Sequence, residues 1–196
     1  AGVARAVVRS RYASAVAAIE VNISCPNVAN RGLVFACDPA SSHKVMTLVR
    51  EEVPRGLPML AKLSPDVTDI VEIADTVLKA GAHGLTMINT TLGVAIDVDR
   101  LRPHLIAATG GLSGPAIRPM AVRAVWQVAG AMRAGRIKTA PIVGVGGVRS
   151  GRDALELVAA GASAIQVGTA AFNDPTAPER VGRELEQLVA ERGFDR

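Results

Sequence analysis

The sequence is poor in several residue types, and each shortage argues against a class of protein. Aromatic residues make up only 3% of the 196 residues, and no cluster of Lys or Arg is interleaved with them, so a nucleic-acid surface is not expected despite the formal net charge of +4. No apolar run approaches the roughly 18 residues of a membrane-spanning helix. The N-terminal stretch does not read as a signal peptide, because Arg5, Arg9 and Arg11 interrupt it. We therefore expect neither a nucleic-acid nor a membrane partner.

Cysteine and histidine are also scarce. The two cysteines, Cys25 and Cys37, do not form a C-x-x-C pair, and the three histidines are scattered along the chain. This pattern gives no support to a metal site. Two cysteines in a chain of this length are typical of reduced thiols, so we expect a cytoplasmic protein.

Aliphatic residues are abundant, and they occur in segments separated by glycine-bounded polar stretches. This alternation indicates a single α/β domain over residues 1–196. Five βα units of this kind fit either a (β/α)8 barrel or a doubly wound sheet, and a complete barrel needs about 250 residues. The predicted strands are 17–23, 59–63, 84–88, 141–145 and 164–167.

Local signals place helices between these strands. Asp38-Pro39 predicts a helix start, and Ser150 followed by Asp153 resembles a capping box. Residues 90–114 form a connection too long for an ordinary βα loop, which is typical of functional loops. Further helices are expected to end near 12–15, to start at 67, and to span 119–132 and 178–191.

Polar side chains that carry chemistry follow the strands. The segment Val21-Asn22-Ile23-Ser24-Cys25-Pro26-Asn27 joins two amides, which can donate and accept hydrogen bonds, to a thiol that can take a proton. Cysteine alone is more often a small buried residue. Asn89 and Thr90 follow a later strand, where they are also ordinary turn residues.

Lys62 and two glycine sites complete the candidates. Lys62 lies within the apolar strand MLAKLSP, so its side chain either meets an anion in the interior or extends outward to solvent. Gly146-Gly147 and Gly168-Thr169 follow the last two strands. In barrels these loops often bind phosphate through backbone N–H groups, although such glycines also serve tight turns. The segment TGGLSG does not match the dinucleotide motif, so we do not expect NAD to bind this chain.

Six ordered motifs carry a resemblance to a known family: VNISCPN, KLSP at Lys62, INTTLG at Ile88, TGGLSGPAIRP at Thr109, GVGGV at Gly144 and QVGTAAF at Gln166. The chain resembles class 1 dihydroorotate dehydrogenases of pyrimidine biosynthesis, most closely the NAD-linked class 1B catalytic subunits. The resemblance implies strands four to eight of a (β/α)8 TIM-type barrel, with the N-terminal strands missing.

The resemblance also implies a reaction and its residues. Cys25 would act as the general base that removes a proton from C5 of dihydroorotate, while C6 gives hydride to FMN and orotate is formed. Lys62 would contact the flavin ring and Ile88 would pack on it. An iron–sulfur FAD electron-transfer subunit and a homodimer core are implied as partners. The implied FMN-binding residues are Asn22, Lys62, Ile88, Gly114, Gly146, Gly147, Gly168 and Thr169; the implied orotate-binding residues are Asn22, Asn27, Asn89 and Thr90.

Two alternatives stay open. A dihydropyrimidine dehydrogenase-type FMN domain has a similar cysteine loop, but such domains usually carry His where this chain has Asn27. The second alternative is an inactive half-barrel fragment, because the missing strands carry further substrate-binding residues in the family.

Overall fold

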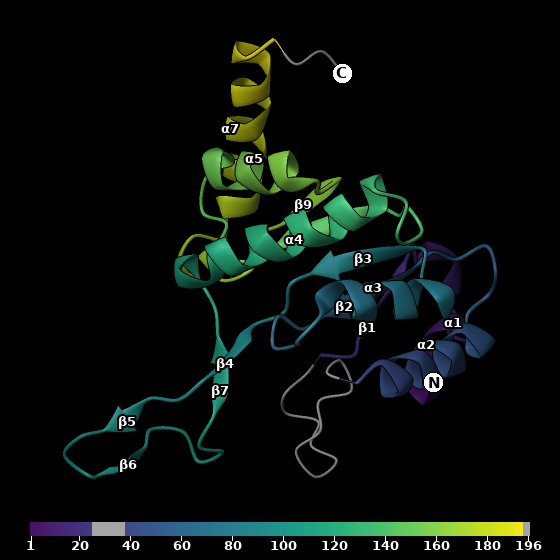
Figure 1. The fold of residues 1–196 in the computed structure, drawn as a ribbon, viewed down its shortest axis with the longest axis horizontal. Coiled ribbons are helices and arrows are strands. Elements are labelled where there is room, and N and C mark those ends of the chain that lie inside the picture. The colour runs from purple at the N-terminus through teal and green to yellow at the C-terminus, as the bar shows by residue number, and fades with distance from the viewer. Residues whose placement is uncertain (25–37, 194–196) are drawn as a thin grey trace.

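Five parallel strands form the central sheet of the computed structural model, which describes residues 1–24 and 38–193 (Figure 1). Cys25 and Asn27 lie outside the described residues. The strands follow one another across the sheet in chain order, and every neighbouring pair is parallel. They are β1 (Ile19–Asn22), β2 (Met59–Leu63), β3 (Gly84–Met87), β8 (Ile142–Val145) and β9 (Ala164–Gln166).

The strand order decides between the two predicted architectures. A doubly wound sheet reverses its strand order at a switch point, whereas the order here never reverses. The helices also contact one another in succession, α2 with α3, α3 with α4, α4 with α5 and α5 with α7, as in the outer ring of a barrel. They are α2 (Pro39–Glu52), α3 (Ile70–Lys79), α4 (Arg118–Arg133), α5 (Gly151–Ala160) and α7 (Ala177–Glu191).

Alternation along the strands divides the sheet into two faces. In β2, Met59, Ala61 and Leu63 are fully buried, while the residues between them are half-buried. Leu85 and Met87 in β3 are likewise fully buried. These residues belong to the main hydrophobic core, which also contains helix residues such as Leu157. The opposite, inner face carries the polar side chains, because side chains of a strand alternate between faces.

Helix starts follow their caps, with one correction. Asp38 accepts a hydrogen bond from Ser41 N, and Ser150 and Asp153 form the predicted capping box. The helix expected from residue 67 begins instead at Ile70, because the Asp69 carboxylate accepts hydrogen bonds from the N–H groups of the first turn.

The N-terminal prediction was wrong in detail. A helix was expected to end near residues 12–15, but the chain forms α1 (Gly2–Val8) and then a separate 3-10 turn, η1 (Ala13–Ala15). A short helix that was not predicted, α6 (Ala170–Asn173), follows β9.

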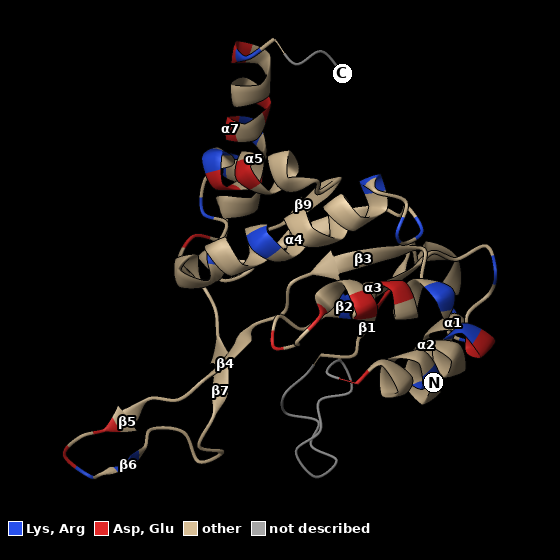
Figure 2. Ribbon diagram, viewed as in Figure 1, with Lys and Arg blue, Asp and Glu red and all other residues tan. Residues whose placement is uncertain are grey.

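The long connection 90–114 forms an arm that extends away from the sheet (Figure 1). Two antiparallel pairs build it, β4 with β7 and β5 with β6. Charged residues gather at its tip, while elsewhere acidic and basic residues are interspersed over the helices (Figure 2). The pairs are β4 (Thr91–Gly93), β7 (Gly110–Leu112), β5 (Ile96–Asp97) and β6 (Arg102–Pro103), and the turn η3 (Pro115–Ile117) leads from the arm into α4.

Candidate functional site

A cavity of about 340 Å³ lies where several strands end at their carboxyl edge. The loops after β3, β8 and β9 meet there, together with the end of the arm. Another cavity, of about 460 Å³, lies between α3 and α4 and contains none of the predicted site residues. The smaller cavity is lined by nine of them: Lys62, Ile88, Asn89, Thr90, Gly114, Gly146, Gly147, Gly168 and Thr169.

Close backbone approach explains the glycine pair after β8. Gly146 and Gly147 have φ angles of 139° and 73°, in the region that favours glycine. A Cβ at Gly147 would lie 2.8 Å from the carbonyl oxygen of Gly114 and 3.0 Å from Arg118 N. The pair therefore lets the β8 loop pack against the segment that opens α4.

The loop after β9 leaves open space instead. A Cβ at Gly168 would meet nothing within 4 Å, although Gly168 lines the cavity. A Cβ at Gly114 would lie 4.0 Å from Thr169 Cγ2, so the arm's end and the β9 loop face each other. The glycines thus bound a hollow with exposed backbone, as a phosphate-bearing ligand requires.

Backbone hydrogen bonds fix the residues that follow β3. Ile88 N donates to Val145 O and Asn89 N donates to Leu63 O, each at 2.8 Å, which ties this segment to strands on both sides. Ile88 is only 2% exposed and supplies an apolar wall.

Asn89 forms a polar cluster with the end of β1. Its Nδ2 donates to Ser24 Oγ at 2.8 Å and to Asn22 Oδ1 at 3.3 Å, while its Oδ1 accepts from Thr90 N at 2.9 Å. Asn22 Oδ1 also accepts from Ser24 Oγ at 3.1 Å. Asn22 does not line the cavity, and its expected contact with both ligands stays a prediction.

Lys62 extends from β2 toward the inner face, where its Nζ lies 3.4 Å from Glu20 Oε1 in β1. Glu20 Oε2 accepts hydrogen bonds from Thr86 Oγ1 at 2.6 Å and from Gln166 Nε2 at 3.1 Å. Burial raises the pKa of Glu20, but the hydrogen bonds from Thr86 and Gln166 and the charge of Lys62 outweigh it, so the pKa is lowered. The carboxylate is therefore held ionised beside the lysine.

Sequence reasoning missed several residues at this site. Glu20 received no role from the sequence, although it lies two residues before Asn22 and so shares its face of the sheet. Arg149 and Phe172 also line the cavity. Arg149 follows the GVGGV motif directly and offers a cation at the rim, a signal that the sequence contained.

Two negative findings concern the described residues only. Within 1–24 and 38–193, no group of three or more His, Cys, Asp or Glu side chains is arranged to hold a metal ion. Over the same ranges, none of the helices combines the length and the apolar character that crossing a membrane requires.

Comparison with known proteins places this geometry in a family. The family model for dihydroorotate dehydrogenase matches residues 5–189. The catalytic subunit of dihydroorotate dehydrogenase B (NAD(+)) from Geobacter sp. strain M21 is 51% identical over 180 residues, 92% of this chain and 56% of that protein. The corresponding subunit of Citrifermentans bemidjiense is 52% identical over 182 residues, which cover 93% of this chain and 57% of that protein. This chain thus spans somewhat more than half the length of these relatives.

Solved structures agree with the barrel interpretation. A DHODH from Eimeria tenella, crystallised with ferulenol, superposes with a TM-score of 0.75 at 27% identity, covering 98% of this chain and 54% of that one. A ligand-free DHODH structure from the same organism superposes with a TM-score of 0.74 at 26% sequence identity. The five-stranded sheet is accordingly part of a (β/α)8 barrel. From the family match and the relatives together, this chain belongs to the dihydroorotate dehydrogenase family.

Proposed function

We propose that this chain forms the flavin-binding half of a class 1B dihydroorotate dehydrogenase catalytic subunit, which oxidises dihydroorotate to orotate with FMN. One observation carries the proposal: a single cavity is lined by seven of the eight residues expected to contact FMN, and they come from segments that the sequence separates widely. We propose that residues 1–196 form a single domain.

The lining fits the parts of FMN. Ile88 offers an apolar surface for the flavin ring, and Lys62 offers a cation at the cavity floor. Gly147 and Gly168 offer backbone where a phosphate would lie, next to the buried Gly146 and the exposed Arg149. A volume of about 340 Å³ lies within the range of small-molecule sites, roughly 300–1,000 Å³.

Each residue has a definite task in the proposed reaction. When bound, FMN would supply the hydride acceptor for C6 of dihydroorotate. Lys62 would stabilise the negative charge that develops on the ring. Asn89 and Thr90 would bind the substrate's carbonyl and N–H groups, and Asn89 is already held in place by Ser24.

We assign the removal of the proton from C5 of dihydroorotate to Cys25, which lies outside the described residues. A free thiol has a pKa near 8.5, so a modestly lowered value suffices for a base at neutral pH. Asn27, in the same segment, is proposed to bind the substrate.

The relatives are named catalytic subunits, which implies a further subunit. We propose that it is an iron–sulfur FAD protein that passes electrons to NAD, that two catalytic subunits form the core, and that the assembly is cytoplasmic. The 196 residues alone are expected to be inactive, because they span only part of the relatives.

The test is an anaerobic titration of the protein, expressed with all the residues its gene encodes. The protein is first mixed with FMN and then desalted to remove the free cofactor. The absorption bands of bound flavin should persist after this step and should bleach when dihydroorotate is added. Replacing Cys25 with Ala should leave FMN bound but slow bleaching by at least a hundredfold, in line with the usual contribution of a general base. Bleaching by dihydrouracil instead of dihydroorotate would favour the dihydropyrimidine dehydrogenase alternative.

A further inference from the structure

Glu20 is the centre of a polar network that spans the inner face of the sheet. Its carboxylate lies beside Lys62 of β2 and accepts hydrogen bonds from Thr86 of β3 and Gln166 of β9. Side chains from three other strands thus meet at one carboxylate on β1. Thr86 is completely buried, whereas the Glu20 side chain keeps 29% of its surface exposed, so the network runs from the interior of the sheet to its open inner face.

The network orders a side chain that would otherwise be mobile. Lysine carries its charge on a flexible four-carbon stem with many rotamers. Glu20 is itself fixed by the hydroxyl of Thr86 at 2.6 Å and the amide of Gln166 at 3.1 Å, so it is a fixed anion. A fixed anion 3.4 Å from Nζ restrains the ammonium at the cavity floor.

The same anion offsets charge. Lys62 lines the cavity, whereas Glu20, whose carboxylate is 3.4 Å from the Lys62 ammonium, is not part of the lining. A ligand in the cavity therefore meets the lysine with a counter-charge beside it, and the interaction between a flavin ring and this cation is weaker than with a lone lysine.

We propose that Glu20 is a positioning residue that holds the Lys62 ammonium at the cavity floor and moderates its charge, and thereby sets the reduction potential of the bound flavin. The inference rests on the proposed function. It assigns Glu20 no contact with flavin or substrate, so the residue acts through Lys62.

The measurement is the midpoint potential of the bound flavin in wild type and in Glu20→Gln, which is nearly isosteric and can still accept from Thr86. Removing the anion favours the more negatively charged reduced flavin. We expect the ratio of reduced to oxidised flavin to rise about tenfold at a given potential, a positive shift of about 30 mV for a two-electron couple. Glu20→Asp, which keeps the charge, should remain close to wild type. An unchanged or more negative potential in Glu20→Gln overturns the inference.

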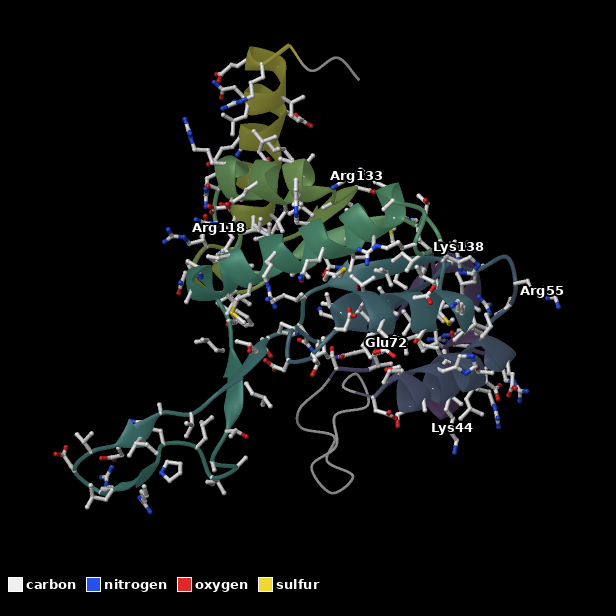
Figure 3. All side chains as sticks on the ribbon, viewed as in Figure 1. Lys44, Arg55, Glu72, Arg118, Arg133 and Lys138 are labelled. Atoms are coloured by element: carbon white, nitrogen blue, oxygen red, sulfur yellow. The ribbon has the colours of Figure 1, made fainter. Side chains whose placement is uncertain are left out.

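Two controls separate the role of Glu20 from general damage. Glu72→Gln removes the same charge from α3, in the helical layer outside the sheet (Figure 3), and should leave the potential unchanged. In a Lys62→Met background the effect of Glu20→Gln should fall to less than half. An equal shift in both backgrounds means that Glu20 does not act through Lys62.

A second readout needs no flavin. In the apoprotein, Glu20→Gln frees the Lys62 amine from its ion pair, and acylation of Lys62 by an amine-specific reagent, followed by mass spectrometry, should be at least threefold faster than in wild type. Equal labelling rates contradict the positioning role. If the wild-type protein binds no FMN, the proposed function is overturned. The labelling rates still test whether Glu20 restrains Lys62, because they are measured without flavin.

Discussion

Gln166 donates a 3.1 Å hydrogen bond to Glu20, although 146 residues separate them in the chain. Gln166 lies in β9 and Glu20 in β1, the two edge strands of the sheet. The sheet is therefore curved far enough for side chains on its opposite edges to meet across the inner face. This curvature also gathers the loops that follow the strands around one cavity.

Gly168→Leu should weaken FMN binding without unfolding the protein. A side chain at this position projects into open space in the cavity wall, and it meets no atom within 4 Å. We expect the dissociation constant for FMN to rise at least tenfold, measured by fluorescence titration, with an unchanged melting temperature. Gly182→Leu is the matched control, because Gly182 is exposed on α7 and also has open space around it. Equal affinity in the Gly168 variant would remove the β9 loop from the site.

Asp66 anchors the arm to the body of the protein. Its carboxylate accepts a hydrogen bond from Leu92 N at 2.8 Å and another from Thr91 Oγ1. Replacing Asp66 with Ala should loosen the base of the arm and speed tryptic cleavage after the exposed Arg100 several-fold. Asp75→Ala, on α3, is the control. If both variants are cleaved at the wild-type rate, Asp66 does not restrain the arm.

Ser150 caps α5, and Ser150→Ala should cost about 1 kcal/mol of unfolding free energy. Its Oγ accepts from Asp153 N at 3.3 Å, while Asp153 accepts from Ser150 N at 3.0 Å. Thermal unfolding should show a fall of about 2–4 °C in melting temperature. The exposed Ser163, changed to Ala, should have almost no effect. A cap that contributes nothing would leave the two variants indistinguishable.

Glu184 joins α7 to the start of α5, and its contribution should depend on pH. Gly151 N donates to its Oε2 at 2.6 Å and Arg180 to its Oε1 at 2.8 Å, and these bonds lower the pKa of Glu184 below its ordinary 4.5. A carboxyl whose pKa is lowered on folding stabilises the protein above its unfolded pKa, and this stabilisation is lost as pH falls through the folded value.

The melting temperature of Glu184→Gln should therefore lie below that of wild type at pH 7, and the difference should shrink as pH drops below about 4.5. Glu179→Gln, on the same helix with only a 3.8 Å ion pair, provides the comparison. A difference that does not change with pH would mean that the ionised carboxylate is not what stabilises the junction.

Local patterns predicted the elements that have strong local causes. The strand 59–63 was predicted to the residue, because it is an apolar run bounded by Pro58 and Pro65. The cap at Ser150 was also predicted, since capping needs only neighbouring residues. The strands of the arm were missed, because they are two or three residues long and too short to show alternation.

Contacts between side chains on different strands could not be predicted from local sequence patterns. From the sequence, the Lys62 side chain could either meet an anion in the interior or extend to solvent. Only the position of Glu20 on the neighbouring strand decides between these two orientations. Arg149 and Phe172 enter the cavity wall because of where their loops fold. Cys25 and Asn27, the base and a substrate contact in the proposal, stay predictions.

The sequence by itself determined the succession of βα units, the helix caps and, through six ordered motifs, the family, because these depend on short stretches of chain. Only the tertiary structure decided that loops far apart in sequence line one cavity, and that Glu20, Lys62 and Gln166 form one network. The physical reason is that sheet curvature arises from the packing of all five strands and their helices, and no local pattern of residues encodes it.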